Sequence, residues 1–237
     1  MTRRNEKLEA ESAFPYLWDA DNPQGYGNRI GRYRTKIELD FLFRHLDRPA
    51  QRILDLGGGS GRFASALTAR GHQVTLVDKN PHGVALAREK GIHHAIACDI
   101  SDFHESGFDC VVCMEVIQYF EKCDPVIAKA SRSLKTGGIF VFCLTNSQSW
   151  RFRLHGLKNR QPGVNAYTME EIERCLKSHN FEVVGRKGFQ WSLAQTGSDS
   201  LLVDISALIE KGLGLQNWLS QSPWLLYACR KVADTAA

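Results

Sequence analysis

The chain has 237 residues, of which 43% are hydrophobic and 24% are charged, as is usual for a globular protein. This composition excludes intrinsic disorder, a collagen-like repeat and a coiled coil as descriptions of the whole chain. Thirty basic and 26 acidic residues leave a net charge of +4 without a dense basic block, so charge gives no reason to predict a nucleic-acid partner.

Strand and helix patterns alternate along the chain. Residues 1–30 are polar and turn-rich and predict an arm over a site, and apolar residues at helical spacing predict a helix over 30–46. Short apolar runs predict strands over 51–56, 72–78, 93–99, 108–114, 137–144, 181–187 and 223–232. Helical patterns between them cover 61–70, 81–90, 124–135, 168–180 and 198–214.

This alternation predicts an α/β fold with a seven-stranded, mostly parallel, doubly wound sheet of Rossmann-like type and helices on both faces. Because no internal repeat or linker interrupts the pattern, we expect a single domain over 1–237. Its predicted parts are an N-terminal arm or cap, a core, a lid insertion and a last strand, at 1–47, 50–187, 189–222 and 223–232. The apolar side of the helix predicted at 198–214 indicates a lid or a dimer contact.

Cysteine usage and the start of the chain indicate the compartment. The first 14 residues hold basic side chains with no apolar stretch behind them, and no run approaches the ~20 apolar residues of a membrane helix. The seven cysteines lie largely in apolar runs, where cysteine behaves as a small hydrophobe. Cys110 and Cys113 form a CxxC pair, but residues three apart in a strand face opposite sides. We therefore expect structural cysteines, no metal site and a cytoplasmic, reduced protein.

The loop after the first strand is the first candidate binding site, because doubly wound sheets bind ligands beyond the carboxyl ends of their strands. It reads Asp55-Leu-Gly57-Gly58-Gly59-Ser-Gly61. A dinucleotide fingerprint needs its third glycine at position 62, which is Arg62, and this disfavours an NAD-dependent dehydrogenase. A carboxylate ahead of the glycines suits a ligand with an ammonium group better than one with a pyrophosphate.

Four segments (53–61, 74–78, 98–100 and 108–116) resemble, in order and spacing, those of class I S-adenosylmethionine (SAM) methyltransferases. The resemblance covers roughly residues 50–187. Within the class, the chain most resembles the ubiquinone-biosynthesis O-methyltransferases (the type 11/12 group) in Arg34, Cys113-Met114-Glu115 and Asn146 with Ser149-Trp150. It implies the class I methyltransferase fold with an N-terminal helical arm and inserted lid helices. The implied cofactor is SAM, with S-adenosylhomocysteine as the product.

The resemblance also implies a role for each matching residue. Asp78 would accept the ribose hydroxyls, Asp99 and Ile100 would hold the adenine, and Met114 would lie beside the sulfonium. Arg34 would reach the methionine carboxylate, with Arg32 and Arg29 as rivals. The full predicted cofactor set is Arg34, Asp55, Gly57, Gly58, Gly59, Gly61, Asp78, Lys79, Asp99, Ile100 and Met114.

The match stops after the fourth strand, where the quinone methyltransferases read E-x-x-E-H. Here Glu115 remains, but Gln118 and Tyr119 replace the second acid and the histidine, so we expect no metal ion and no general base at that histidine position. In-line SN2 alignment of an acceptor with an activated sulfonium supplies much of the rate. The remaining candidate bases are Tyr119, His155 and Tyr167, of which we select His155 and Tyr119. His155 lies in the basic and aromatic segment 149–160.

The predicted function is methyl transfer from SAM to an oxygen or nitrogen of a small molecule, such as a quinone-type phenol, a natural-product intermediate or a sugar. One alternative is methylation of nucleic acid or protein, although the [DN]-P-P-[YF] motif of many amino-group methylases is absent after the fourth strand. Another is a SAM-binding regulator or partner subunit without catalysis. The expected partner is a small-molecule acceptor, with no nucleic acid and no transmembrane segment, for a monomer or a homodimer.

Overall fold

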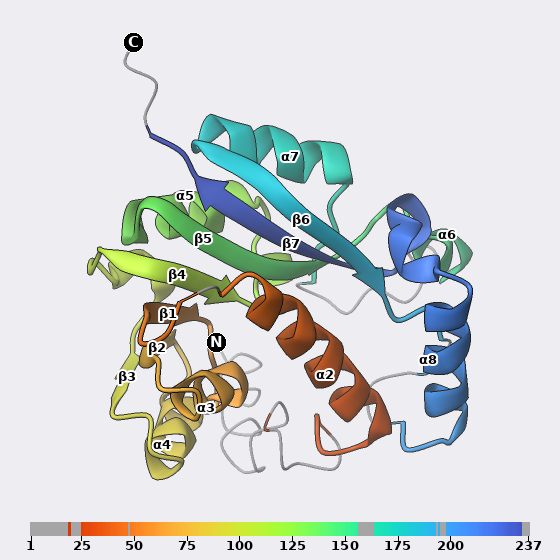
Figure 1. Ribbon diagram of the computed structural model, residues 1–237, viewed down its shortest axis with the longest axis horizontal. Coiled ribbons are helices and arrows are strands. Elements are labelled where there is room, and N and C mark those ends of the chain that lie inside the picture. The colour runs from red at the N-terminus through yellow and green to blue at the C-terminus, as the bar shows by residue number, and fades with distance from the viewer. Residues whose placement is uncertain are drawn as a thin grey trace, which may run out of the picture.

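The computed structural model describes residues 19, 25–46, 48–155, 164–192, 194 and 198–233. Within them a seven-stranded sheet has the order β3-β2-β1-β4-β5-β7-β6 (Figure 1). Its strands are β1 (Arg52–Leu56), β2 (Gln73–Asp78), β3 (His94–Ala97), β4 (Phe108–Cys113), β5 (Leu134–Thr145), β6 (Phe181–Phe189) and β7 (Trp224–Lys231). β7 pairs antiparallel with β5 and β6, whereas all the other pairs are parallel. The predicted seven-stranded, mostly parallel sheet is confirmed.

Helices cover both faces of this sheet. They are α2 (Arg29–Arg44), α3 (Arg62–Thr68), α4 (Pro81–Glu89), α5 (Asp124–Ser133), α6 (Trp150–His155), α7 (Met169–Ser178) and α8 (Leu202–Gly212). Apolar side chains of α2, α3 and α4 form one core with the sheet, and those of α5 and α7 form the other. The capping box predicted from Thr168 and Glu171 is present at the start of α7.

The alternation of side chains along β4 separates the CxxC pair. Cys110 belongs to the core under α2, α3 and α4, and Cys113 belongs to the core under α5 and α7. Both thiols are fully buried, and burial raises their pKa. The prediction that this pair is structural and shares no metal ion agrees with this placement.

The starts of two predicted elements differ from the structure by three residues or more. β5 begins at Leu134 rather than at 137, because α5 ends at Ser133 and Leu134 takes an extended conformation and pairs with Phe108 of β4. The helix predicted to start at 198 starts at Leu202. The residues before it bond to the start of α2 instead: the Ser198 carbonyl accepts from the Ile30 N–H, and the Asp199 carboxylate accepts from the Arg29 N–H.

The segment between β6 and β7 carries α8, which lies beside α2 (Figure 1). Polar groups face inward: Glu210 is 1% exposed and accepts from the Tyr33 hydroxyl at 2.6 Å. The outward side is apolar and exposed, with Leu201, Leu202, Ile205, Leu208, Ile209 and Leu213. None of the helices in the described part of the chain has the length and apolar character needed to cross a membrane.

Candidate functional site

The glycine loop after β1 is folded back against the end of β2. The Gly57 N–H donates to the Val77 carbonyl at 2.7 Å, and φ is +55° at Gly59, a conformation that glycine adopts without strain. A Cβ atom on Gly58 would lie 2.7 Å from Oδ2 of Asp55. Backbone therefore comes close to this carboxylate, as only glycine allows.

Asp78 connects this loop to the neighbouring one. Its Oδ2 accepts from the Gly59 N–H at 2.9 Å and its Oδ1 from the Asn80 N–H at 2.8 Å. Burial raises the pKa of Asp78, while these two hydrogen bonds oppose that rise. A carboxylate has about four lone-pair sites, so each oxygen can accept a further hydrogen bond.

Asp55 is the second buried acid of this edge. Its side chain is 1% exposed, and Oδ2 has no hydrogen-bond partner among the described residues. Burial raises the pKa of Asp55 to about 7, although the Arg62 guanidinium opposes the rise. An orphaned buried carboxylate oxygen is costly, so this one is suited to a cationic donor.

The other predicted cofactor residues lie at the ends of β2, β3 and β4. Asp99 is exposed and caps the short turn Ile100–Asp102 by accepting from the Ser101 N–H at 2.9 Å, and Ile100 is buried. Met114 is buried directly after β4, and Lys79 is exposed. Because the carboxyl ends of parallel strands meet at one edge of the sheet, these residues lie at the same edge as the glycine loop. Their individual roles stay predictions.

Arg34 is buried, and side chains of the protein itself hold its guanidinium group. Its NH1 lies 3.4 Å from Oε2 of Glu115, and its Nε donates to Oε1 of Gln190 at 2.5 Å. The rivals Arg29 and Arg32 instead pair with Asp204 and Asp199 on the surface. Among these three arginines, only Arg34 points into the buried end of the site.

A second arginine, Arg62, completes a buried charge network that the sequence analysis missed. It lies 2.8 Å from Oε2 of Glu38 and 3.3 Å from Oε1 of Glu115, and it stacks on the Tyr26 ring. Tyr26 in turn donates a hydrogen bond to Glu115. From the sequence, Arg62 was used only as evidence against a dinucleotide-binding loop. One signal for the network was present, because Arg34 and Glu38 are four residues apart on a predicted helix and so lie on one face of it.

The two acids of the network have opposite pKa shifts. Burial raises the pKa of Glu38 even with Arg62 beside it, whereas Arg34 and Arg62 overcome burial and lower the pKa of Glu115. Glu115 therefore keeps its negative charge more readily than Glu38 does. The two guanidinium groups thus face one carboxylate that ionises readily and one that resists ionisation, and this balance favours an anionic ligand.

Two of the four non-glycine residues with positive φ in the described part of the chain lie at the same point. Glu115 has φ +58° and Gln190 has φ +64°, and both side chains contact Arg34. Non-glycine residues in this region cost free energy and are found mainly at functional sites. The strain therefore marks the ends of β4 and β6 as part of the site.

The three candidate bases, Tyr167, Tyr119 and His155, differ in what the structure shows of their side chains. The Tyr167 hydroxyl donates to the backbone carbonyls of Ile117 and Phe120, and burial raises its pKa to about 12, so it anchors that loop and cannot act as a base. Tyr119 is 52% exposed, and partial burial together with the Glu115 charge raises its pKa. His155 ends α6, and its side chain lies outside the described residues. The catalytic roles of Tyr119 and His155 stay predictions.

Tryptophans line the same edge beyond β5 and β6. The ring centroids of Trp150 and Trp191 are 6.5 Å apart, and those of Trp191 and Trp218 are 5.7 Å apart. The Trp191 indole donates to Ser222, but the buried Nε1 of Trp150 has no partner in the described chain. This aromatic wall thus presents one unused N–H donor.

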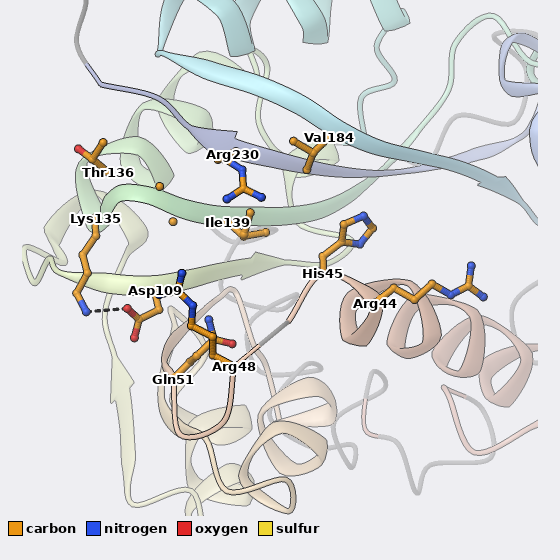
Figure 2. Close-up of a pocket in the computed structure, with 12 residues that line it drawn as sticks. Arg44, His45, Arg48, Gln51, Asp109, Lys135, Thr136, Ile139, Val184 and Arg230 are labelled. Atoms are coloured by element: carbon orange, nitrogen blue, oxygen red, sulfur yellow. Dashed lines mark hydrogen bonds and ion pairs between the residues drawn. The ribbon is translucent and has the colours of Figure 1, made fainter.

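A cavity of about 440 Å³ lies at the other edge of the sheet (Figure 2). Arg44, His45 and Arg230 line it, together with the ion pair of Lys135 and Asp109 at 2.7 Å. Asp109 lies near the start of β4, whereas the glycine loop follows the end of the parallel β1. This cavity is therefore separate from the predicted site.

Comparisons with known proteins agree with this geometry. Residues 27–185 match the family model of the methyltransferase domain. A ubiquinone biosynthesis O-methyltransferase of Xanthomonas oryzae pv. oryzae is 30% identical over 145 residues, which are 58% of this chain and 59% of that protein. The chain thus spans about three fifths of the length of the curated relatives it matches.

Solved structures show the same fold at low sequence identity. A possible histamine N-methyltransferase from Thermotoga maritima is 17% identical, with a TM-score of 0.61 over 97% of this chain and 96% of that one. A geranyl diphosphate C-methyltransferase from Streptomyces coelicolor A3(2) is 18% identical, with a TM-score of 0.60 over 86% of this chain and 80% of that one. With the strand order, the glycine loop and the family match together, the chain belongs to the methyltransferase domain family and has the class I methyltransferase fold.

Proposed function

We propose that this protein transfers a methyl group from SAM to the hydroxyl oxygen of a small aromatic molecule. The observation that carries the proposal is Asp78, which ends β2, orders the glycine loop and keeps capacity for further hydrogen bonds. A carboxylate in this position suits the two hydroxyls of a ribose. The family match and the O-methyltransferase relatives support the reaction class.

The residues present fit the amino-acid end of SAM as well. The orphaned Oδ2 of Asp55 would accept from the ammonium group. Arg34, in a network that favours an anionic ligand, would hold the carboxylate after releasing part of its contact with Glu115. When bound, SAM supplies an electrophilic methyl group on a sulfonium, so the residues of the protein do not have to activate that methyl group.

We expect SAM affinity to depend on the ionisation of Asp55. Because the pKa of Asp55 is about 7 in the free protein, the carboxyl is mostly protonated at pH 6 and accepts no charge-assisted bond. Affinity for SAM should therefore rise about fivefold from pH 6 to pH 7, while the ligand's α-amino group stays charged. Calorimetric titration at both pH values measures this. The Asp55→Asn variant is the control, and a pH dependence unchanged in that variant would exclude Asp55 as its source.

The acceptor class follows from the aromatic wall. Stacked indoles of Trp150, Trp191 and Trp218 favour a planar aromatic acceptor, and the free Nε1–H of Trp150 can donate to an oxygen on its ring. The guanidinium of Arg151 donates to the backbone carbonyls of Ser192 and Ala194. Arg151 therefore holds the backbone next to Trp191 and is not assigned to binding an anionic substrate. We propose a phenol in preference to a sugar or a nucleic acid for this reason.

The contribution of the protein to the reaction is chiefly alignment. Holding the hydroxyl in line with the methyl group removes much of the entropic cost of the bimolecular step. A base would add about 10²- to 10⁴-fold, and we assign this role to His155, with Tyr119 as a hydrogen-bonding neighbour. The raised pKa of Tyr119 keeps its hydroxyl protonated near neutral pH, so it would donate to the acceptor oxygen rather than take its proton.

Replacing Trp150 with phenylalanine should raise KM for phenolic acceptors about fivefold with little change in kcat. The ring that stacks is kept, and only one hydrogen-bond donor, worth about 1 kcal/mol, is lost. Steady-state kinetics with a panel of catechols measures the change. Trp218→Phe is the matched control, because Trp218 is 57% exposed at the end of the stack. Equal effects of the two substitutions would contradict the assigned donor.

The direct test is turnover. Purified protein, SAM and a panel of phenols, amines and sugars are incubated, and S-adenosylhomocysteine formation is followed with mass analysis of each acceptor. We expect a mass gain of one methyl group on phenols. SAM binding by calorimetry without turnover on any acceptor would favour the non-catalytic regulator, and absence of SAM binding would overturn the proposal altogether.

A further inference from the structure

Three side chains with metal-binding atoms gather between α5 and α7, away from the glycine loop. The ligand atoms of Asp124, Cys175 and His179 all lie within 4.8 Å of one another. Nε2 of His179 is 2.8 Å from Oδ1 of Asp124, and Sγ of Cys175 is 3.9 Å from the same oxygen. Cys123 directly precedes Asp124 and brings a further thiol to the start of α5.

Two helix ends position these groups. Cys175 and His179 are four residues apart at the end of α7, so both side chains lie on one helix face. Cys123 is the N-cap residue of α5, and Asp124 is its first helical residue. Cys175 and Asp124 thus lie within two packed helices, and His179 and Cys123 are cap residues of the same helices, which preorganises their positions.

We propose that Asp124, Cys175 and His179 bind a zinc ion, with Cys123 as the fourth ligand. Thiolate, imidazole and carboxylate are the ligands that zinc takes in proteins. In a tetrahedral site with ordinary zinc–ligand distances the ligand atoms are about 3.4–3.8 Å apart. The separations in the structure bracket that range, so small side-chain rotations open the ion pair of His179 and Asp124 and admit the metal.

Solvent can reach the site. Asp124 is exposed, and Cys175 and His179 are half-buried, so an ion can enter without unfolding either helix. Binding would fasten α7 to the start of α5, which follows the loop that carries Glu115 and Tyr119. The sequence analysis predicted no metal because it weighed the CxxC pair, whose thiols face opposite sides of the sheet, and the segment after β4, where Gln118 and Tyr119 replace two expected ligands.

The test is a zinc titration of the reduced, chelator-treated full-length protein, in competition with a chromogenic chelator. We expect one equivalent to bind. Loss of an outer partner of a metal site costs about 10- to 100-fold in affinity, so Cys175→Ser or His179→Ala should cost at least about 100-fold. Substitution with Co²⁺ should give thiolate-to-metal charge-transfer absorption in wild type, reduced in Cys123→Ser.

Cys98→Ser is the matched control, because Cys98 is a half-buried thiol outside the cluster. Far-UV circular dichroism verifies that each variant folds. Wild type that binds less than about one tenth of an equivalent would overturn the proposal, leaving an ordinary ion pair between the helices. Equal loss in Cys98→Ser would overturn it as well, and unchanged cobalt absorption in Cys123→Ser would remove that residue from the site. None of these readouts depends on SAM or on methyl transfer.

Discussion

Replacing Arg62 with glutamine should lower the free energy of unfolding by about 3–5 kcal/mol at pH 9. Arg62 is 8% exposed, and its guanidinium faces two buried carboxylates, Glu38 and Glu115. Glutamine keeps some hydrogen bonding but leaves negative charge buried without its cation. Removing one partner of a buried ion pair is costly for this reason, even where the intact pair contributes little.

The loss should be smaller at pH 6 than at pH 9. The pKa of Glu38 is raised in the folded state by burial, and it rises further once Arg62, which opposes the shift, is gone. A group with a raised folded-state pKa destabilises the protein increasingly as pH rises from its unfolded toward its folded pKa. At pH 6 Glu38 in the variant takes up a proton and relieves the buried charge.

Urea denaturation of wild type and variant at both pH values measures these differences. Arg32→Gln is the matched control, because Arg32 pairs with Asp199 on the surface, where the side chains are 61% and 71% exposed. Such exposed pairs contribute about 0–1 kcal/mol. If Arg62→Gln is no more destabilising than Arg32→Gln, the network around Glu38 does not stabilise the fold.

Replacing Asp78 with alanine should weaken SAM binding by at least about 100-fold. Two charge-assisted hydrogen bonds from ribose hydroxyls, at about 1.5–3 kcal/mol each, would be lost, and each 1.4 kcal/mol is tenfold in affinity. The substitution also frees the Gly59 N–H, which orders the loop. Calorimetric titration with SAM, S-adenosylhomocysteine and NAD⁺ measures the effect.

Glu182→Ala provides the comparison, since Glu182 is an exposed acid on β6. It should bind SAM as wild type does. An Asp78→Ala protein that keeps full SAM affinity would place the ribose elsewhere, and binding of NAD⁺ alone by wild type would contradict the methyltransferase assignment of the site.

The local pattern of the chain was enough to predict the elements and their class. Apolar runs such as Val74–Asp78 become buried central strands because only a covered parallel sheet can accommodate them. The glycine loop and Asp78 are close in sequence to the strands that hold them, so their positions followed from the strand ends. The starts predicted at 137 and 198 lie at Leu134 and Leu202 in the structure, because pairing with β4 and bonds to α2 decide them and neither contact is local.

The sequence by itself determined the fold class, the edge of the sheet that carries the glycine loop, and the acids near the ends of β1 and β2. Only the tertiary structure decided which distant side chains meet there. Arg62, Glu38, Gln190 and the tryptophans come from separate elements, and the pKa of Glu38 is raised because the packing of these elements buries it. The same holds for Asp124, Cys175 and His179. Periodicity reports which face of an element is buried, whereas charge pairing and ligand geometry depend on which faces pack together.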